Sequence, residues 1–71
     1  MKIIDVSDRY TYAQSHIQWS INVPYDVLIN NYRQYLNKNE NYYLYCKSGK
    51  LSKRATMVLS SLGYKVFHLE K

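Results

Sequence analysis

One cysteine stands where a side chain could act as a nucleophile. Cys46 follows the apolar run 42–45 and opens a short polar loop, after which a helical pattern begins near Ser52. At such a turn from strand to helix, backbone N–H groups and the positive end of the helix dipole favour a thiolate over a thiol. The sequence therefore predicts a nucleophile in a loop that can cradle an anion.

The other residues of this loop suit that chemistry. Gly49 gives the loop backbone freedom and leaves room for a substrate, while Lys47 and Lys50 add positive potential that lowers a thiol pKa and attracts anions. We expect Ser52 to be the N-cap of the following helix. Two plainer interpretations stay open: Cys46 as a small buried apolar residue, and the two lysines as merely solvated side chains.

Strands that alternate with helices must position the loop. Short connections between such elements indicate an α/β fold, in which a parallel β-sheet carries helices on its faces and places ligands at the carboxyl ends of its strands. Asp8 or Ser7 is the expected cap of a first short helix, and Gly63 is the expected left-handed end of the last one. The patterns predict strands at 2–6, 20–23, 42–46 and 65–69, a short helix through Tyr10, Tyr12 and Ala13, and helices at about 27–36 and 52–62.

The loop resembles the active-site loop of rhodanese-like sulfurtransferases. Cys46, Gly49 and Ser52 match that motif, Lys47 replaces a frequent Arg, and Leu51 departs from it at a position where relatives place Arg, Ser or Thr. Three further stretches resemble the family in the expected order. They are Ile4-Asp5-Val6 with Ser7 in place of the usual Arg, the stretch 15–24 with Trp19 where the family has Gly, and the closing segment 62–70.

The resemblance implies a sulfurtransferase or persulfide carrier that works without a cofactor. Cys46 would take a sulfane sulfur from a thiosulfate-like donor and pass it to a thiol or cyanide acceptor. The persulfide would be held by the loop residues Lys47, Ser48, Gly49, Lys50, Leu51 and Ser52. Asp5 is expected to order neighbouring loops, whereas His16 and His68 are expected to be structural, and no metal site is expected.

Length and composition add further expectations. The 71 residues fit a single rhodanese-like domain, 1–71, that stops where the family's C-terminal helix would begin. One sheet face or edge should then be poorly covered unless a partner or a second copy of the chain covers it. With one cysteine there can be no intramolecular disulfide, and the sequence has no signal segment or long apolar run. We therefore expect a cytoplasmic protein with no membrane partner.

Other functions compete with sulfur transfer. A non-catalytic rhodanese-like binding or regulatory module is favoured by Ser7, by Leu51 and by the missing helix. A cysteine phosphatase or arsenate reductase is disfavoured, because those loops end in an Arg that grips the oxyanion, where this chain has Ser52. The net charge of +5 permits nucleic-acid binding, but the basic residues near the loop form only a local cluster without a recognition motif.

Overall fold

A sheet of four parallel strands carries the cysteine loop. The computed structural model describes residues 1–70, and within them the strand order is β2-β1-β3-β4. β1 pairs with β2 and β3, and β3 pairs with β4, all in parallel. The strands are β1 (Lys2–Asp5), β2 (Ile21–Asn22), β3 (Asn41–Tyr45) and β4 (Lys65–His68). The expected α/β sheet is confirmed, with strands somewhat shorter than the sequence patterns indicate.

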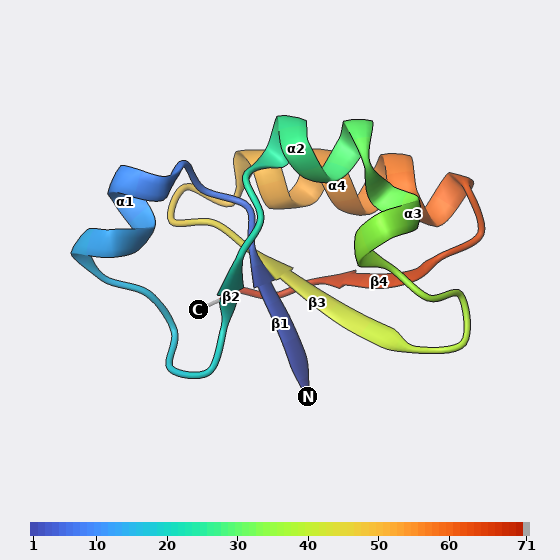
Figure 1. Ribbon diagram of the computed structural model, residues 1–71, viewed down its shortest axis with the longest axis horizontal. Coiled ribbons are helices and arrows are strands. Elements are labelled where there is room, and N and C mark those ends of the chain that lie inside the picture. Colours follow the sequence, from blue (N-terminus) through green and yellow to red (C-terminus); the bar gives the residue numbers. More distant parts are fainter. Residues whose placement is uncertain (71) are drawn as a thin grey trace.

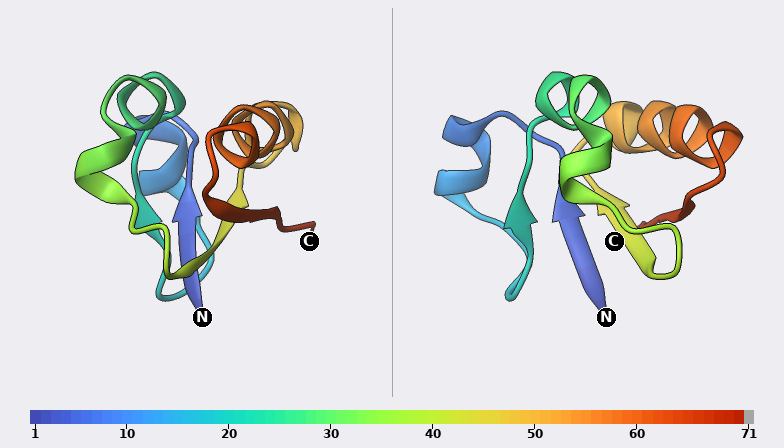
Figure 2. Two further views of the ribbon diagram at one scale, coloured as in Figure 1. Left: turned by 90° about the vertical axis from the view of Figure 1, so that its right-hand side faces the viewer. Right: turned by 45° about the vertical axis from the view of Figure 1, so that its right-hand side comes forward.

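Three of the helices lie on one side of this sheet. α2 (Tyr25–Asn30), α3 (Tyr32–Tyr35) and α4 (Lys50–Ser61) gather above the strands, whereas α1 (Arg9–Gln14) lies apart from them (Figures 1 and 2). Asp8 caps α1 as expected, accepting a hydrogen bond from the Thr11 N–H (2.8 Å). α4 has 12 residues. Within residues 1–70, no helix is long and apolar enough to cross a bilayer.

The alternation of side chains along the strands separates the core from an open face. Ile4, Leu44 and Val66 are buried on the helix side, where they meet Leu28 of α2 and Leu59 of α4. Since neighbouring residues of a strand point to opposite faces, the next positions lie on the other side of the sheet. There the rings of Tyr43 and Phe67 contact each other at a tilt of 32° with centroids 5.6 Å apart, and Phe67 is 46% exposed. The expectation of a thinly covered sheet face is confirmed.

The expected helix at 27–36 is wrong in one respect, because the chain forms two short helices there. Asn31 separates α2 from α3, with φ −137° outside the helical range. Its side chain donates to the Val27 carbonyl oxygen (2.9 Å), a bond with which Asn competes against the helical backbone pattern. The first of the two helices also begins earlier, at Tyr25, directly after Pro24.

Candidate active site

The cysteine loop lies at the carboxyl ends of the two central strands. The Val6 N–H donates to the Tyr45 carbonyl oxygen (2.8 Å), which joins the end of β1 to the last residue of β3. Cys46 follows at once, and its carbonyl oxygen accepts from the Gly49 N–H (3.2 Å). Gly49 adopts φ +79° and precedes α4 directly. The loop is therefore a tight turn that passes from strand to helix over a left-handed glycine.

Ser52 is not the N-cap that the sequence suggested. α4 begins at Lys50, and Gly49 occupies the cap position without a side-chain hydrogen bond. Ser48, just before the cap, accepts from the Lys50 N–H through its hydroxyl (3.2 Å). Because the helix starts earlier than expected, Ser52 lies inside its first turn, fully buried, and faces the cysteine.

Hydrogen-bond donors converge on the Cys46 sulfur. The Ser52 N–H donates to Sγ at 3.4 Å, and the hydroxyl oxygens of Ser52 and Ser48 lie 3.5 Å and 3.9 Å from it. Burial raises the pKa of the thiol, but hydrogen bonds from the Ser52 hydroxyl, the Ser52 and Leu51 N–H groups and the Ser48 hydroxyl lower it by more. The net pKa of Cys46 lies below its ordinary value, so the site favours the thiolate.

Two small hollows flank the loop and share Cys46, Lys47 and Ser48 in their walls. The first, about 210 Å³, opens toward the end of β4. The second, about 240 Å³, opens toward the turn that leads into α1. Gly49 and Lys53 line the first hollow and Leu51 lines the second, whereas Lys50 is exposed and lines neither. Lys53 therefore lines a hollow beside the cysteine, whereas Lys50 does not.

His68 is a residue of this site that the sequence did not reveal. It ends β4 as the expected strand histidine, but its Nδ1 lies 2.9 Å from the Ser52 hydroxyl oxygen, and its ring lines the first hollow. The available signal was its position at the carboxyl end of a strand, because these ends gather at one edge of a parallel sheet. Its pairing with β3, in which Leu44 aligns with His68, brings the ring to the loop.

Asp5 organises the neighbouring turn. It is 1% exposed, and its carboxylate accepts from the Ser7 N–H (2.8 Å). Asn22 ties the same turn to β2, because its side-chain amide donates to the carbonyl oxygens of Asp5 and Ser7, both at 2.9 Å. The Asp5 carboxylate and the Asn22 amide therefore both hold the backbone that follows β1.

His16 lies in the turn after α1. Its ring stacks on Tyr12 at 3.8 Å, and its Nδ1 lies 2.7 Å from the Tyr12 carbonyl oxygen. Within residues 1–70, no group of three His, Cys, Asp or Glu side chains is placed to hold a metal ion.

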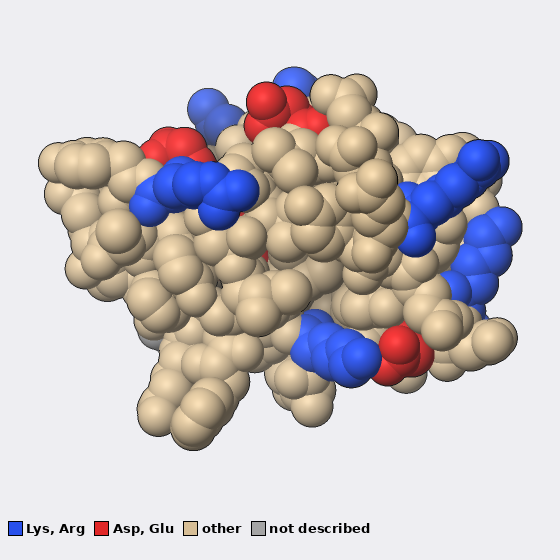
Figure 3. Space-filling model, in the orientation of Figure 1, with Lys and Arg blue, Asp and Glu red and all other residues tan. Residues whose placement is uncertain are grey.

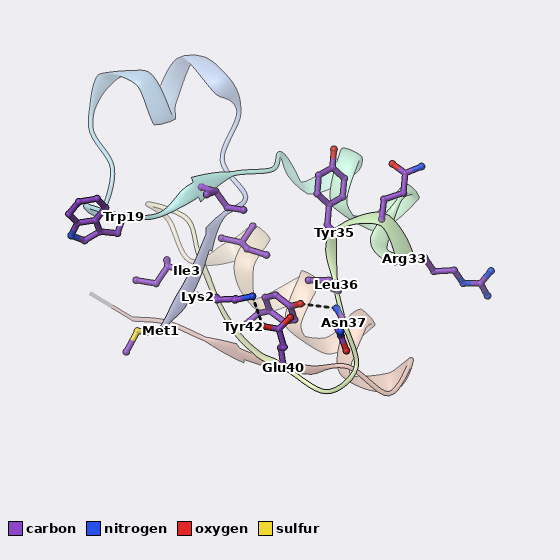
Figure 4. A pocket seen from close by; sticks show the side chains of 13 residues that line it. Met1, Lys2, Ile3, Trp19, Arg33, Tyr35, Leu36, Asn37, Glu40 and Tyr42 are labelled. Atoms are coloured by element: carbon purple, nitrogen blue, oxygen red, sulfur yellow. Dashed lines mark hydrogen bonds and ion pairs between the residues drawn. The ribbon is translucent and has the colours of Figure 1, made fainter.

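A larger hollow, about 610 Å³, lies at the other end of the strands (Figure 4). It is lined by residues at the beginnings of β1 and β3, including the ion pair of Lys2 with Glu40, and by Trp19 and Tyr35. Since Cys46 follows the end of β3, this hollow is separate from the thiol. None of its lining residues lines either hollow beside Cys46.

Basic side chains are dispersed on the face drawn in Figure 3. Lys and Arg residues stand there in several separate places, some beside Asp or Glu, and they form no continuous patch on that face. A nucleic-acid interface normally needs basic residues gathered on one face or along one helix. The charge pattern on this face therefore gives no support to the nucleic-acid alternative.

The fold and the loop define an α/β domain in which a cysteine lies between a central parallel strand and a helix. The family described as Rhodanese-like domain matches residues 1–71, and the chain belongs to this family. The family includes sulfurtransferases. None of the curated proteins shows a significant match to the sequence.

Solved structures support the same assignment. A rhodanese-related protein from Thermoplasma volcanium superposes with a TM-score of 0.87 and 28% identity, over 97% of this chain and 68% of its own. A rhodanese-like domain protein from Staphylococcus aureus superposes with a TM-score of 0.86 and 29% sequence identity, over 97% of this chain and 67% of its own. The reduced CoADR-RHD of Bacillus anthracis superposes with a TM-score of 0.85 and 30% sequence identity, over 94% of this chain but only 12% of its own. The same fold thus also occurs as a small part of a much longer protein.

Proposed function

We propose that this protein is a sulfurtransferase or persulfide carrier in which Cys46 receives and releases a sulfane sulfur. The observation that carries the proposal is the polar surrounding of one sulfur atom, to which the Ser52 N–H donates at 3.4 Å and near which the Ser52 and Ser48 hydroxyl oxygens lie at 3.5 Å and 3.9 Å. Donors placed in this way stabilise a thiolate, and the same donors can stabilise the anionic outer sulfur of a persulfide.

The proposed reaction has two displacement steps. The Cys46 thiolate attacks the outer sulfur of a thiosulfate-like anion, a bond forms between the two sulfurs, and sulfite leaves with the electron pair of the broken sulfur–sulfur bond. Cyanide or a thiolate then attacks the outer sulfur of the Cys46 persulfide. Thiocyanate or a new persulfide leaves, and the Cys46 thiolate is restored. No cofactor or external oxidant is required by this sequence of steps.

The hollows beside Cys46 support a small anionic donor. Their volumes, about 210 Å³ and 240 Å³, suit a small anion better than a cofactor-sized ligand, for which pockets of roughly 300–1,000 Å³ are usual. Lys47 and Lys53 supply two positive charges to the walls of the first hollow, against one negative charge from Glu70. Because the chemistry needs a free thiol, we also propose that the protein works in a reducing compartment such as the cytoplasm.

The test is formation of thiocyanate from thiosulfate and cyanide by the purified chain. We expect turnover by the wild-type protein and none by Cys46→Ser, which preserves the shape of the side chain but removes the sulfur. His16→Asn is a matched control in the turn after α1, and it should retain full activity. If wild-type protein and Cys46→Ser produce thiocyanate equally, or if neither produces any, the proposal is wrong.

A second candidate is a rhodanese-like binding module without catalysis. Two observations favour it: Cys46 is only 5% exposed, and apolar Leu51 lines a hollow where relatives place a polar residue that can bind an anion. The same assay separates the two functions, because a binding module would fold normally and yet leave thiosulfate untouched.

A further inference from the structure

The Ser52 hydroxyl connects Cys46 to His68. Its oxygen lies 3.5 Å from the Cys46 sulfur, 2.9 Å from His68 Nδ1 and 3.2 Å from the Gly49 carbonyl oxygen. A serine hydroxyl has one hydrogen to donate and two lone pairs to accept with. Three polar neighbours therefore compete for one hydrogen, and the protonation of the imidazole decides which neighbour receives it.

The surroundings of the imidazole indicate where its hydrogen lies. His68 Nε2 is buried and has no hydrogen-bond partner within residues 1–70. This nitrogen is unsatisfied in either neutral tautomer, as a donor with the hydrogen or as an acceptor without it, so the choice of tautomer is made at Nδ1. With the hydrogen on Nδ1, the ring donates to the Ser52 oxygen at 2.9 Å while the Ser52 hydroxyl donates to the Gly49 carbonyl oxygen at 3.2 Å, so both bonds form together. The neutral ring with its hydrogen on Nδ1 is the form that fits this site.

With Nδ1 donating, the Ser52 hydrogen is free for another acceptor. Beside a Cys46 thiol it can point to the Gly49 carbonyl oxygen, and beside a thiolate it can turn to the sulfur. This rotation of the Ser52 hydroxyl leaves the Gly49 carbonyl oxygen with a hydrogen-bond partner, because that oxygen also accepts from the Lys53 N–H (3.1 Å). If Nδ1 were an acceptor, it would capture the Ser52 hydrogen and leave only oxygen lone pairs facing the sulfur.

We propose that His68 is a positioning residue, which donates from Nδ1 to Ser52 and thereby directs the Ser52 hydroxyl hydrogen to the Cys46 sulfur whenever the thiol is deprotonated. The inference rests on the proposed function in treating the thiolate as the reactive form. It concerns how the thiolate is maintained, and it holds for any reaction of that thiolate.

The first experiment measures alkylation of Cys46 by iodoacetamide as a function of pH, which does not depend on sulfur transfer. His68→Leu removes the donor, and His68→Asn has a similar size and can place an amide N–H near the position of Nδ1. Below the plateau of the pH profile, we expect His68→Leu to react roughly three- to tenfold more slowly and His68→Asn within about twofold of wild type. Lys47, Lys53 and Glu70, the other charged residues that line this hollow, remain in both variants.

Coupling through Ser52 distinguishes positioning from a general structural effect. In a Ser52→Ala background, His68→Leu should cause no further loss, because the hydroxyl through which it acts is gone. Equal losses in both backgrounds, an unchanged rate in His68→Leu, or an equal loss in His68→Asn would overturn the proposal. His16→Leu and His16→Asn, in the turn after α1, serve as the matched pair and should alkylate like wild type.

A second measurement needs no substitution in the site. The ¹⁵N shifts of the imidazole rings, assigned by comparison with His16→Asn, should show His68 Nδ1 protonated and Nε2 unprotonated. A hydrogen on Nε2 would overturn the proposal even if every His68 variant failed to fold. Protein that shows the expected alkylation pattern but forms no thiocyanate would refute the proposed function and leave this inference intact.

Discussion

The conformation of Gly49 gives the most closely defined prediction for the loop. With φ +79°, the residue lies in the left-handed region that side chains other than Gly rarely adopt. A methyl group added there would meet His68 Cε1 at 3.6 Å and Nε2 at 3.9 Å, which are ordinary contact distances. The cost of Gly49→Ala is therefore conformational, with no steric clash.

The loss of stability in Gly49→Ala can be estimated from the backbone conformation alone. The left-handed conformation costs an L-residue roughly 1–2 kcal/mol, so Gly49→Ala should lower the free energy of unfolding by about that amount. For a domain of this size, each kcal/mol corresponds to a fall in melting temperature of roughly 4–8 °C. Gly49→Asn should lose less than Gly49→Ala, because Asn tolerates the left-handed region better.

Thermal unfolding followed by circular dichroism measures the stability, and iodoacetamide alkylation measures the sulfur environment. Gly63→Ala is the matched control, since Gly63 has φ +95° at the far end of α4 and its added methyl group would meet only the flexible end of Lys38. Both variants should lose stability, but only Gly49→Ala should also slow alkylation of Cys46. Wild-type stability and reactivity in Gly49→Ala would refute the account of the loop.

Three further predictions concern charge and strain. The pKa of Cys46 is lower in the folded protein than in the unfolded chain. At pH values between these two pKa values, the unfolded chain therefore binds more protons than the folded protein. The free energy of unfolding should rise with pH across that interval in urea titrations, and a rise of equal size in Cys46→Ala would contradict the assignment. Leu51→Arg places a cation in the hollow beside Cys46 and should lower the KM for thiosulfate about two- to fivefold, whereas an unchanged KM would exclude this position from donor binding. Trp19 has φ +73° and is 85% exposed, so Trp19→Gly should raise the free energy of unfolding by about 0.5–1 kcal/mol in urea titrations, and a loss would show that the ring has a packing role.

Local chemistry made several parts of the fold predictable. Asp8 was expected to cap α1 and Gly63 to end α4, and both do, because short acceptor side chains and left-handed glycines act through their own neighbours. Ala55 and Leu59 lie four residues apart in an apolar helical pattern on α4, and both are fully buried. Leu62, from the same apolar pattern, is 41% exposed because the helix has ended by then.

The site depended on more distant contacts, which the sequence shows less directly. Cys46 and Gly49 could be placed in a loop from their order, but the exact start of α4 decided whether Ser52 capped the helix or faced the sulfur. His68 reaches Ser52 only because β4 pairs with β3 in one register. A strand pattern indicates which residues alternate, whereas the register between two strands is set by the whole sheet.

The measurement that tests the central claim most directly is the intact mass of the protein after incubation with thiosulfate and removal of excess reagent. We expect wild-type protein to gain the mass of one sulfur atom on Cys46, to lose it on addition of cyanide, and Cys46→Ser to gain nothing. A folded wild-type protein that gains no sulfur, or a Cys46→Ser variant that gains as much, would contradict the claim that this thiol carries a persulfide.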